Sequence, residues 1–151
     1  MKIPYGISNF KDLITGGYVY IDKTAYIATL EEAGKYQILL RPRRFGKSLF
    51  LSTLWHYYDV RYRDEFATLF GALHIGQHPT PLKSSYPVLF MEFSGIETDS
   101  YEQVFSGFNA AVATWLKACL QRYGYSQDAI DKAICSYRRL PPYPSLALGC
   151  C

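Results

Sequence analysis

The sequence lacks any apolar run long enough to cross a membrane, and its N-terminal segment MKIPYGISNF lacks the apolar core of a secretory signal peptide. We therefore expect a cytoplasmic protein with no membrane partner. The chain has 4 cysteines, with no C-x-x-C pair and no metal-ligand spacing to His56, His74 or His78. This pattern predicts reduced thiols and argues against a structural zinc site.

Charge is sparse as well, because only 19% of the residues are charged. The 16 basic and 13 acidic side chains leave a net charge of +3, which permits an anionic ligand but does not require nucleic acid. Several of the basic residues are concentrated at 41–47. With 49% hydrophobic residues, the 151-residue chain has the composition of a globular protein with one domain.

Hydrophobic patterning predicts strands and helices in alternation. Two apolar runs, 36–40 and 87–93, are typical of buried strands. Helices are expected at 8–16, 22–34, 47–58, 64–70, 100–124 and 127–137. Such alternation predicts an α/β fold with a parallel sheet covered on both faces. Because two strands are fewer than the roughly five of a doubly wound sheet, we expect an incomplete sheet, from part of a longer protein.

The residues with the clearest chemical role are Arg41-Pro42-Arg43-Arg44-Phe45-Gly46-Lys47-Ser48. They contain the second half of the phosphate-loop pattern G-x-x-x-x-G-K-S/T. Gly46 permits a tight turn that points N–H groups at phosphate oxygens, Lys47 places a positive charge near the β- and γ-phosphates, and Ser48 offers a hydroxyl to Mg²⁺. The helix that starts there directs its positive end at the same anion.

Arg41 stands where the pattern has its first glycine, so the match is partial. The position of the loop between a predicted buried strand and an amphipathic helix favours a phosphate site; the alternative is a surface turn that happens to read RRFGKS. Arg43 and Arg44 could each clamp phosphate, and we expect at least one of them near the ligand without a choice between them. The predicted fold is then the three-layer α/β/α P-loop NTPase fold.

The chain resembles the predicted AAA-ATPase-like family along most of its length. The resemblance is carried by Ile3-Pro4-Tyr5-Gly6-Ile7 and Phe10, by 17–24, by the string 40–48, by Leu69-Phe70 and by Tyr86-Pro87-Val88. It implies ATP and Mg²⁺ as ligands, an arginine as the usual first loop residue, and in many members a C-terminal nuclease domain. The resemblance makes residues 1–151 the N-terminal part of such an ATPase: a segment at 1–35, the strand, loop and helix at 36–60, a second strand with helices at 86–137, and an irregular tail at 138–151.

The resemblance also implies a Walker B strand that ends in two acids, and no such segment follows Leu140. Glu92, at the end of the run 88–92, is either that acid or a strand-end residue with another role. We therefore expect weak binding of Mg-ATP and very slow hydrolysis. The alternatives are a nucleic-acid-associated module that acts through a C-terminal nuclease domain, and an inactive fragment whose open sheet edge a homo-oligomer would cover.

Two further expectations concern segments outside the loop. Tyr20, Asp22, Lys23 and Thr24 correspond to a segment that lies over the adenine base in related P-loop ATPases, while Asp22 could equally be a plain helix cap. The absence of the guanine-reading motif N-K-x-D favours ATP over GTP. His56, among aromatic residues on the helix after the loop, is interpreted as a partly buried structural histidine.

Overall fold

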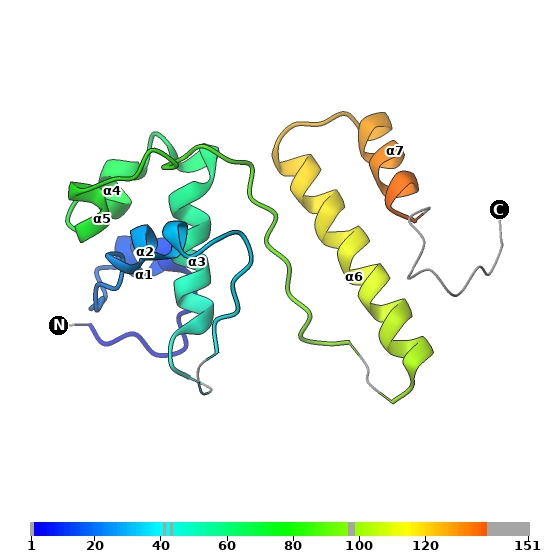
Figure 1. The fold of residues 1–151 in the computed structure, drawn as a ribbon, viewed down its shortest axis with the longest axis horizontal. Helices are drawn as coiled ribbons and strands as arrows, with labels where there is room; N and C mark the ends of the chain where they lie inside the picture. Colours follow the sequence, from blue (N-terminus) through cyan, green and yellow to red (C-terminus); the bar gives the residue numbers. More distant parts are fainter. Residues whose placement is uncertain (1, 41, 43, 97–98, 139–151) are drawn as a thin grey trace. The chain divides into compact units, whose positions relative to one another are not determined.

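The computed structural model describes residues 2–40, 42, 44–96 and 99–138, and these residues form helices joined by extended segments (Figure 1). They divide into two compact units, and the boundary along the chain lies between Val88 and Leu89. The predicted tail at 138–151 lies outside the described residues apart from Arg138. Each unit has its own packing, which we describe separately.

The predicted α/β/α sheet is wrong for the part of the chain that the structure describes. Those residues form no strand, and their β pairing is limited to two isolated parallel bridges, Lys2 to Tyr18 and Asp59 to Tyr86. The run 36–40 is extended but unpaired, and Tyr36, Ile38 and Leu40 are 96%, 86% and 84% exposed. An apolar run indicates a preference for strand, but a strand exists only where a second segment completes the hydrogen-bonded ladder.

The first unit consists of short helices. They are α1 (Phe10–Thr15), α2 (Tyr26–Glu32), α3 (Lys47–Tyr58), the 3-10 turn η1 (Val60–Tyr62), α4 (Phe66–Phe70) and α5 (His74–Gln77). The Asn9 side chain, rather than that of Ser8, caps α1 by accepting from the Asp12 N–H. Asp22 does not cap α2, whose N-cap residue is Ala25 and has no side-chain hydrogen bond.

Aromatic rings fill the core of the first unit. Phe70 stacks on Phe10 at 4.8 Å and on Phe66 at 5.1 Å between ring centroids, and it meets the ring of Tyr57 edge-on at 5.6 Å. Ile27 of α2 belongs to the same buried cluster. Because Tyr57 lies on α3, this core anchors the helix whose first residue is Lys47.

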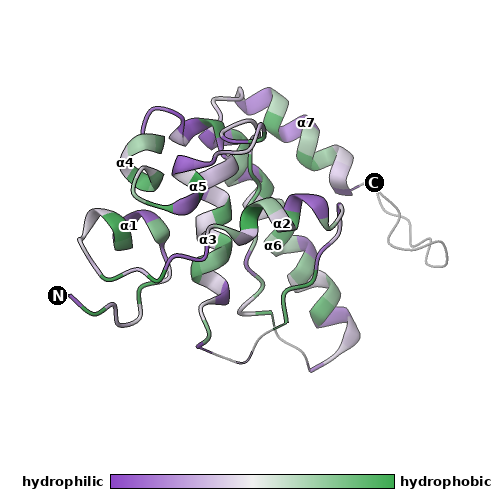
Figure 2. Ribbon diagram, turned by 60° about the vertical axis from the view of Figure 1, so that its left-hand side comes forward, coloured by the Kyte–Doolittle hydropathy of each residue, from purple (hydrophilic) through white to green (hydrophobic). Residues whose placement is uncertain are grey.

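The second unit is a helical hairpin of α6 (Tyr101–Arg122) and α7 (Gln127–Arg138), which run side by side in yellow and orange (Figure 1). Ser100 caps α6, because its hydroxyl accepts from the Gln103 N–H. The Tyr137 hydroxyl donates to Asn109 Oδ1 at 2.9 Å and so joins the two helices. Hydrophobic residues recur along α6 (Figure 2), and several of them, including Tyr101 and Phe108, are exposed.

Candidate functional site

The loop 41–48 ends in a tight turn that starts the longest helix of the first unit. Gly46 is the N-cap residue of α3 and has a left-handed backbone (φ 75°, ψ 19°), and its carbonyl accepts from the Phe50 N–H at 2.9 Å. Glycine adopts this conformation without the steric penalty of a Cβ atom. The turn therefore leaves the unpaired N–H groups of the first turn of α3 at the loop, where an anion is favoured.

Lys47 folds back across the loop. Its ammonium group donates to the Pro42 carbonyl at 3.1 Å, and its side chain is half-buried. This contact bridges five residues and holds the positive charge over the turn. Ser48 follows as the second residue of α3 and is exposed. Among the loop residues described, the structure thus brings together Pro42, Gly46 and Lys47, while Arg41 and Arg43 lie outside the described residues.

Arg44 also has a left-handed backbone, with φ 67°. For a residue other than glycine this conformation is uncommon, and it occurs preferentially at turns and functional sites. Left-handed residues within a short loop turn successive N–H groups towards one side and form an anion-binding hollow. Phe45 separates Arg44 from Gly46 in this loop, and the Arg44 side chain is exposed to solvent.

A small pocket adjoins this turn. Its volume is about 160 Å³, and its walls come from α2, from the run 36–40 and from the start of α3. The lining residues are Lys23, Tyr26, Leu30, Leu39, Phe45, Gly46, Lys47 and Phe50. Apart from the two lysines and the glycine, the walls are apolar or aromatic, which suits a flat ring system placed beside the cationic loop.

Residues 20–24, the segment expected over a nucleobase, have two different roles in the structure. Lys23 lines the pocket, whereas Asp22 and Thr24 hold α5. Asp22 accepts from the His74 N–H at 2.8 Å, and the Thr24 hydroxyl oxygen accepts from the Ile75 N–H at 3.1 Å. Burial by itself would raise the pKa of Asp22, but the hydrogen bonds that its carboxylate accepts, from the His74 N–H and from the hydroxyl and N–H of Thr24, outweigh this effect, so the pKa is lowered. Asp22 therefore supports the fold as a cap of α5.

His56 is buried among the rings of Phe10, Trp55 and Tyr62, and its Nδ1 donates to the Ser52 carbonyl at 2.7 Å. The structural interpretation of this histidine is confirmed. Burial lowers its pKa, so the neutral ring is favoured in the folded protein. Within the described ranges, no group of three or more His, Cys, Asp or Glu side chains could hold a metal ion.

Sequence reasoning did not single out the pocket walls on α2 or the side chain that ties α2 in place. The Glu31 carboxylate accepts from the hydroxyl groups of Tyr58 at 2.9 Å and Thr80 at 2.8 Å. The predicted helix at 22–34 contains Tyr26 and Leu30, four residues apart, and this spacing is typical of a shared helix face. The partner of that face could not be read from spacing, because 36–40 and 45–50 reach it only in the folded chain.

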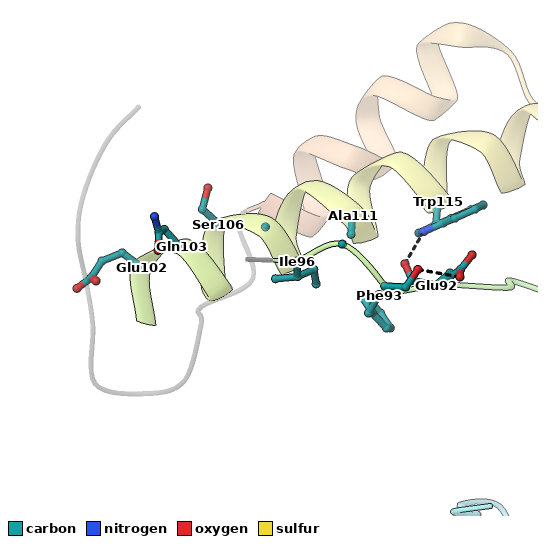
Figure 3. Close-up of a pocket in the computed structure, with 11 residues that line it drawn as sticks. Glu92, Phe93, Ile96, Glu102, Gln103, Ser106, Ala111 and Trp115 are labelled. Carbon is teal, nitrogen blue, oxygen red and sulfur yellow. Dashed lines mark hydrogen bonds between the residues drawn. The ribbon is translucent and has the colours of Figure 1, made fainter. Parts of the chain in front are cut away.

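Glu92 lies in the second unit, on an extended segment beside α6. Its carboxylate accepts from the Ser94 hydroxyl at 2.8 Å, and its backbone carbonyl accepts from Trp115 Nε1 at 3.1 Å (Figure 3). These residues border an open hollow of about 730 Å³ along α6. Gly107 permits the close approach, since a Cβ there would lie 3.0 Å from Ile96 Cγ2. The loop 41–48 belongs to the other unit.

Comparison with known proteins places the sequence in a family. The predicted AAA-ATPase family matches residues 4–139. The chain belongs to this family. The family name indicates nucleotide use in general.

A curated relative is similar over a shorter stretch. An uncharacterized protein in the vnfD 5′ region of Azotobacter chroococcum is 52% identical over 54 residues, which cover 35% of this chain and 10% of that protein. The match thus spans a tenth of the relative's length. No solved structure is significantly similar to this predicted AAA-ATPase family member. In the part of the chain that is described, none of the helices is both long and apolar enough for a transmembrane span.

Proposed function

We propose that this chain binds Mg-ATP at the loop 41–48. The observation that carries the proposal is the Lys47 ammonium, held 3.1 Å from the Pro42 carbonyl over the left-handed turn at Gly46. In this arrangement the N–H groups at the start of α3 and the Lys47 charge bind the β- and γ-phosphates. The Ser48 hydroxyl is placed one residue into the helix, where it would contact Mg²⁺.

The pocket beside the loop supports a nucleoside triphosphate rather than a simple phosphate ion. Tyr26, Phe45 and Phe50 offer aromatic faces for a base, and Lys23 offers a cation at its edge. A base in this pocket would leave its triphosphate next to Gly46 and Lys47. We propose adenine as the base, because the sequence has no N-K-x-D element for guanine.

Hydrolysis by this chain is proposed to be very slow. Phosphoryl transfer needs a group that orients the attacking water and a carboxylate that helps to hold the metal. The described residues that line the pocket beside the loop include two lysines and no carboxylate. The site therefore supplies the cradle for the phosphates without a described group that activates water.

The test is isothermal titration of the chain with Mg-ATP, with a Lys47→Ala variant and a matched Lys117→Ala control on the exposed part of α6. Loss of the ammonium from the loop should raise the Kd at least about tenfold, which corresponds to about 1.4 kcal/mol. The control should bind as the unchanged chain does. Absence of any binding, or equal affinity in the Lys47→Ala variant, would refute the proposal.

A second titration tests the role of Ser48. If its hydroxyl contacts Mg²⁺, adding magnesium should tighten ATP binding in the unchanged chain and have little effect in Ser48→Ala. Magnesium dependence that survives this substitution would remove Ser48 from the metal site while leaving the phosphate loop intact.

A further inference from the structure

Helix α2 presents two different faces to the rest of the first unit. Lys23, just before the helix, and Tyr26 and Leu30 line the pocket beside the loop. Ile27 and Glu31, four residues apart on the neighbouring face, point into the unit, where Ile27 is fully buried. The same short helix is thus a wall of the proposed nucleotide site and a part of the core.

Glu31 joins α2 to the last turn of α3 and to the loop at residue 80. Its Oε1 accepts from the Tyr58 hydroxyl at 2.9 Å and from the Thr80 hydroxyl at 2.8 Å. The Thr80 N–H donates to the Tyr57 hydroxyl oxygen at 2.8 Å, and the two hydroxyl oxygens of Tyr57 and Thr80 lie 2.9 Å apart. One carboxylate therefore organises hydroxyl groups from two other segments.

Each hydroxyl proton in this network has a defined direction. The Thr80 proton is given to Glu31, so the proton between Tyr57 and Thr80 must come from Tyr57. The Tyr58 proton is also given to Glu31. Burial, together with this hydrogen bond to Glu31, raises the pKa of Tyr58, so the phenol keeps its proton throughout the neutral range. The hydroxyl groups of Tyr58 and Thr80 thus both donate to Glu31 on α2, and Tyr57 donates to Thr80.

The position of α2 depends on such anchors because the helix is weak by itself. It has 7 residues and no side-chain N-cap, and isolated helices of this length are not stable in water. Its C-terminal end is held by the Gln37 side-chain amide, which donates to the carbonyls of Leu30 and Gly34. Gln37 lies two residues before Leu39, another residue of the pocket lining, so this contact also links α2 to the run 36–40.

We infer that Glu31 is a positioning residue that sets the distance between α2 and α3 and thereby shapes the base-side pocket for the nucleotide. The inference rests on the proposed function of the loop 41–48. Helix α3 carries Lys47 and Phe50 at its start and Tyr57 and Tyr58 at its end. A bond from α2 to the end of α3 consequently sets where Tyr26 and Leu30 stand relative to Phe50. Phosphate binding at Gly46 and Lys47 does not use α2, so it should be independent of Glu31.

The experiment compares two ligands, Mg-ATP and Mg-tripolyphosphate, which share the phosphate chain but not the base. In Glu31→Ala the Kd for Mg-ATP should rise about tenfold, because ATP binding must then supply the free energy for placing α2 that the hydrogen bonds to Glu31 otherwise supply. The Kd for tripolyphosphate should stay within about twofold. Glu31→Gln keeps an acceptor oxygen and should restore most of the ATP affinity, and Glu32→Ala, an exposed change on the same helix, should leave both constants unchanged.

Equal weakening of both ligands in Glu31→Ala would overturn the inference, since a general loss of structure acts on the whole site. Unchanged ATP affinity would overturn it as well. If Glu31→Ala does not fold, Tyr58→Phe and Thr80→Val each remove one donor and should give the same split between the two ligands. Lys47→Ala distinguishes the proposed phosphate site from the role of Glu31, because it should weaken the binding of both ligands if the loop binds phosphate. Binding of neither ligand by the unchanged chain would refute the proposed function and this inference together.

Discussion

Replacing Gly46 by alanine tests the backbone geometry of the loop without removing any charged group. Gly46 has φ 75°, and an added Cβ would meet no atom within 4 Å. The substitution therefore introduces conformational strain and no collision. A left-handed conformation costs an L-residue roughly 1–2 kcal/mol. This cost applies in every state in which residue 46 has the left-handed conformation that the ligand requires.

The free-energy cost of this strain is shared between the free energy of unfolding and the binding free energy. If alanine at 46 keeps φ positive, the free energy of unfolding falls by the full amount and binding is unaffected. If the loop relaxes to a negative φ, the free energy of unfolding is unchanged. The ligand must then restore the left-handed turn on binding, so the Kd rises by roughly five- to thirtyfold. The losses in stability and in binding free energy should therefore sum to roughly 1–2 kcal/mol.

Gly124→Ala provides a matched control. Gly124 has φ 78° in the turn between α6 and α7, and a Cβ there also meets no atom within 4 Å. In either variant alanine lowers the conformational entropy of the unfolded chain, which stabilises the folded state by about 0.4–1 kcal/mol. This effect cancels when the two variants are compared. Denaturant unfolding and titration with Mg-ATP should show a loss of stability alone for Gly124→Ala. If the summed loss in stability and binding free energy for Gly46→Ala is well below the loss of stability for Gly124→Ala, the left-handed turn is not needed for the site and the reasoning fails.

Three further predictions concern the first unit. Because burial lowers the pKa of His56 below 6.5, the unfolded chain takes up this proton first as pH falls, so the free energy of unfolding should decrease from pH 7 to 5 in denaturant titrations and change less in His56→Gln. Phe70→Ala should lower the free energy of unfolding by about 3–5 kcal/mol, measured in the same way, whereas Tyr5→Ala, at a side chain that is 97% exposed, should change it by less than about 0.5 kcal/mol. Asp22→Ala should destabilise by about 1 kcal/mol at pH 7. That difference should shrink as acid protonates Asp22, whose lowered pKa makes its contribution present above 3.8 and lost as pH falls below it; a constant difference down to pH 2 would contradict the capping role.

Local patterns predicted the helices better than the tertiary pairing. The periodicity that indicated a helix after the loop is confirmed by α3, and Ser100 caps α6 as its side-chain chemistry indicates. These features depend on residues within one or two turns of each other. The sheet was wrong because the runs 36–40 and 87–93 needed partner segments, and an apolar run carries no information about which segment, if any, lies beside it.

The sequence by itself determined the order of Gly46, Lys47 and Ser48, and the apolar spacing after them predicted their place at the start of a helix. Tertiary structure alone decided what surrounds the loop. It folds Lys47 back onto Pro42, brings Lys23 and Tyr26 beside Phe45, and ties Glu31 to Tyr58 and Thr80. The hydrogen bonds from Glu31 on α2 join residues 27 and 49 positions apart, and their formation depends on the closure of loops and the burial of a shared aromatic core, which no local pattern encodes.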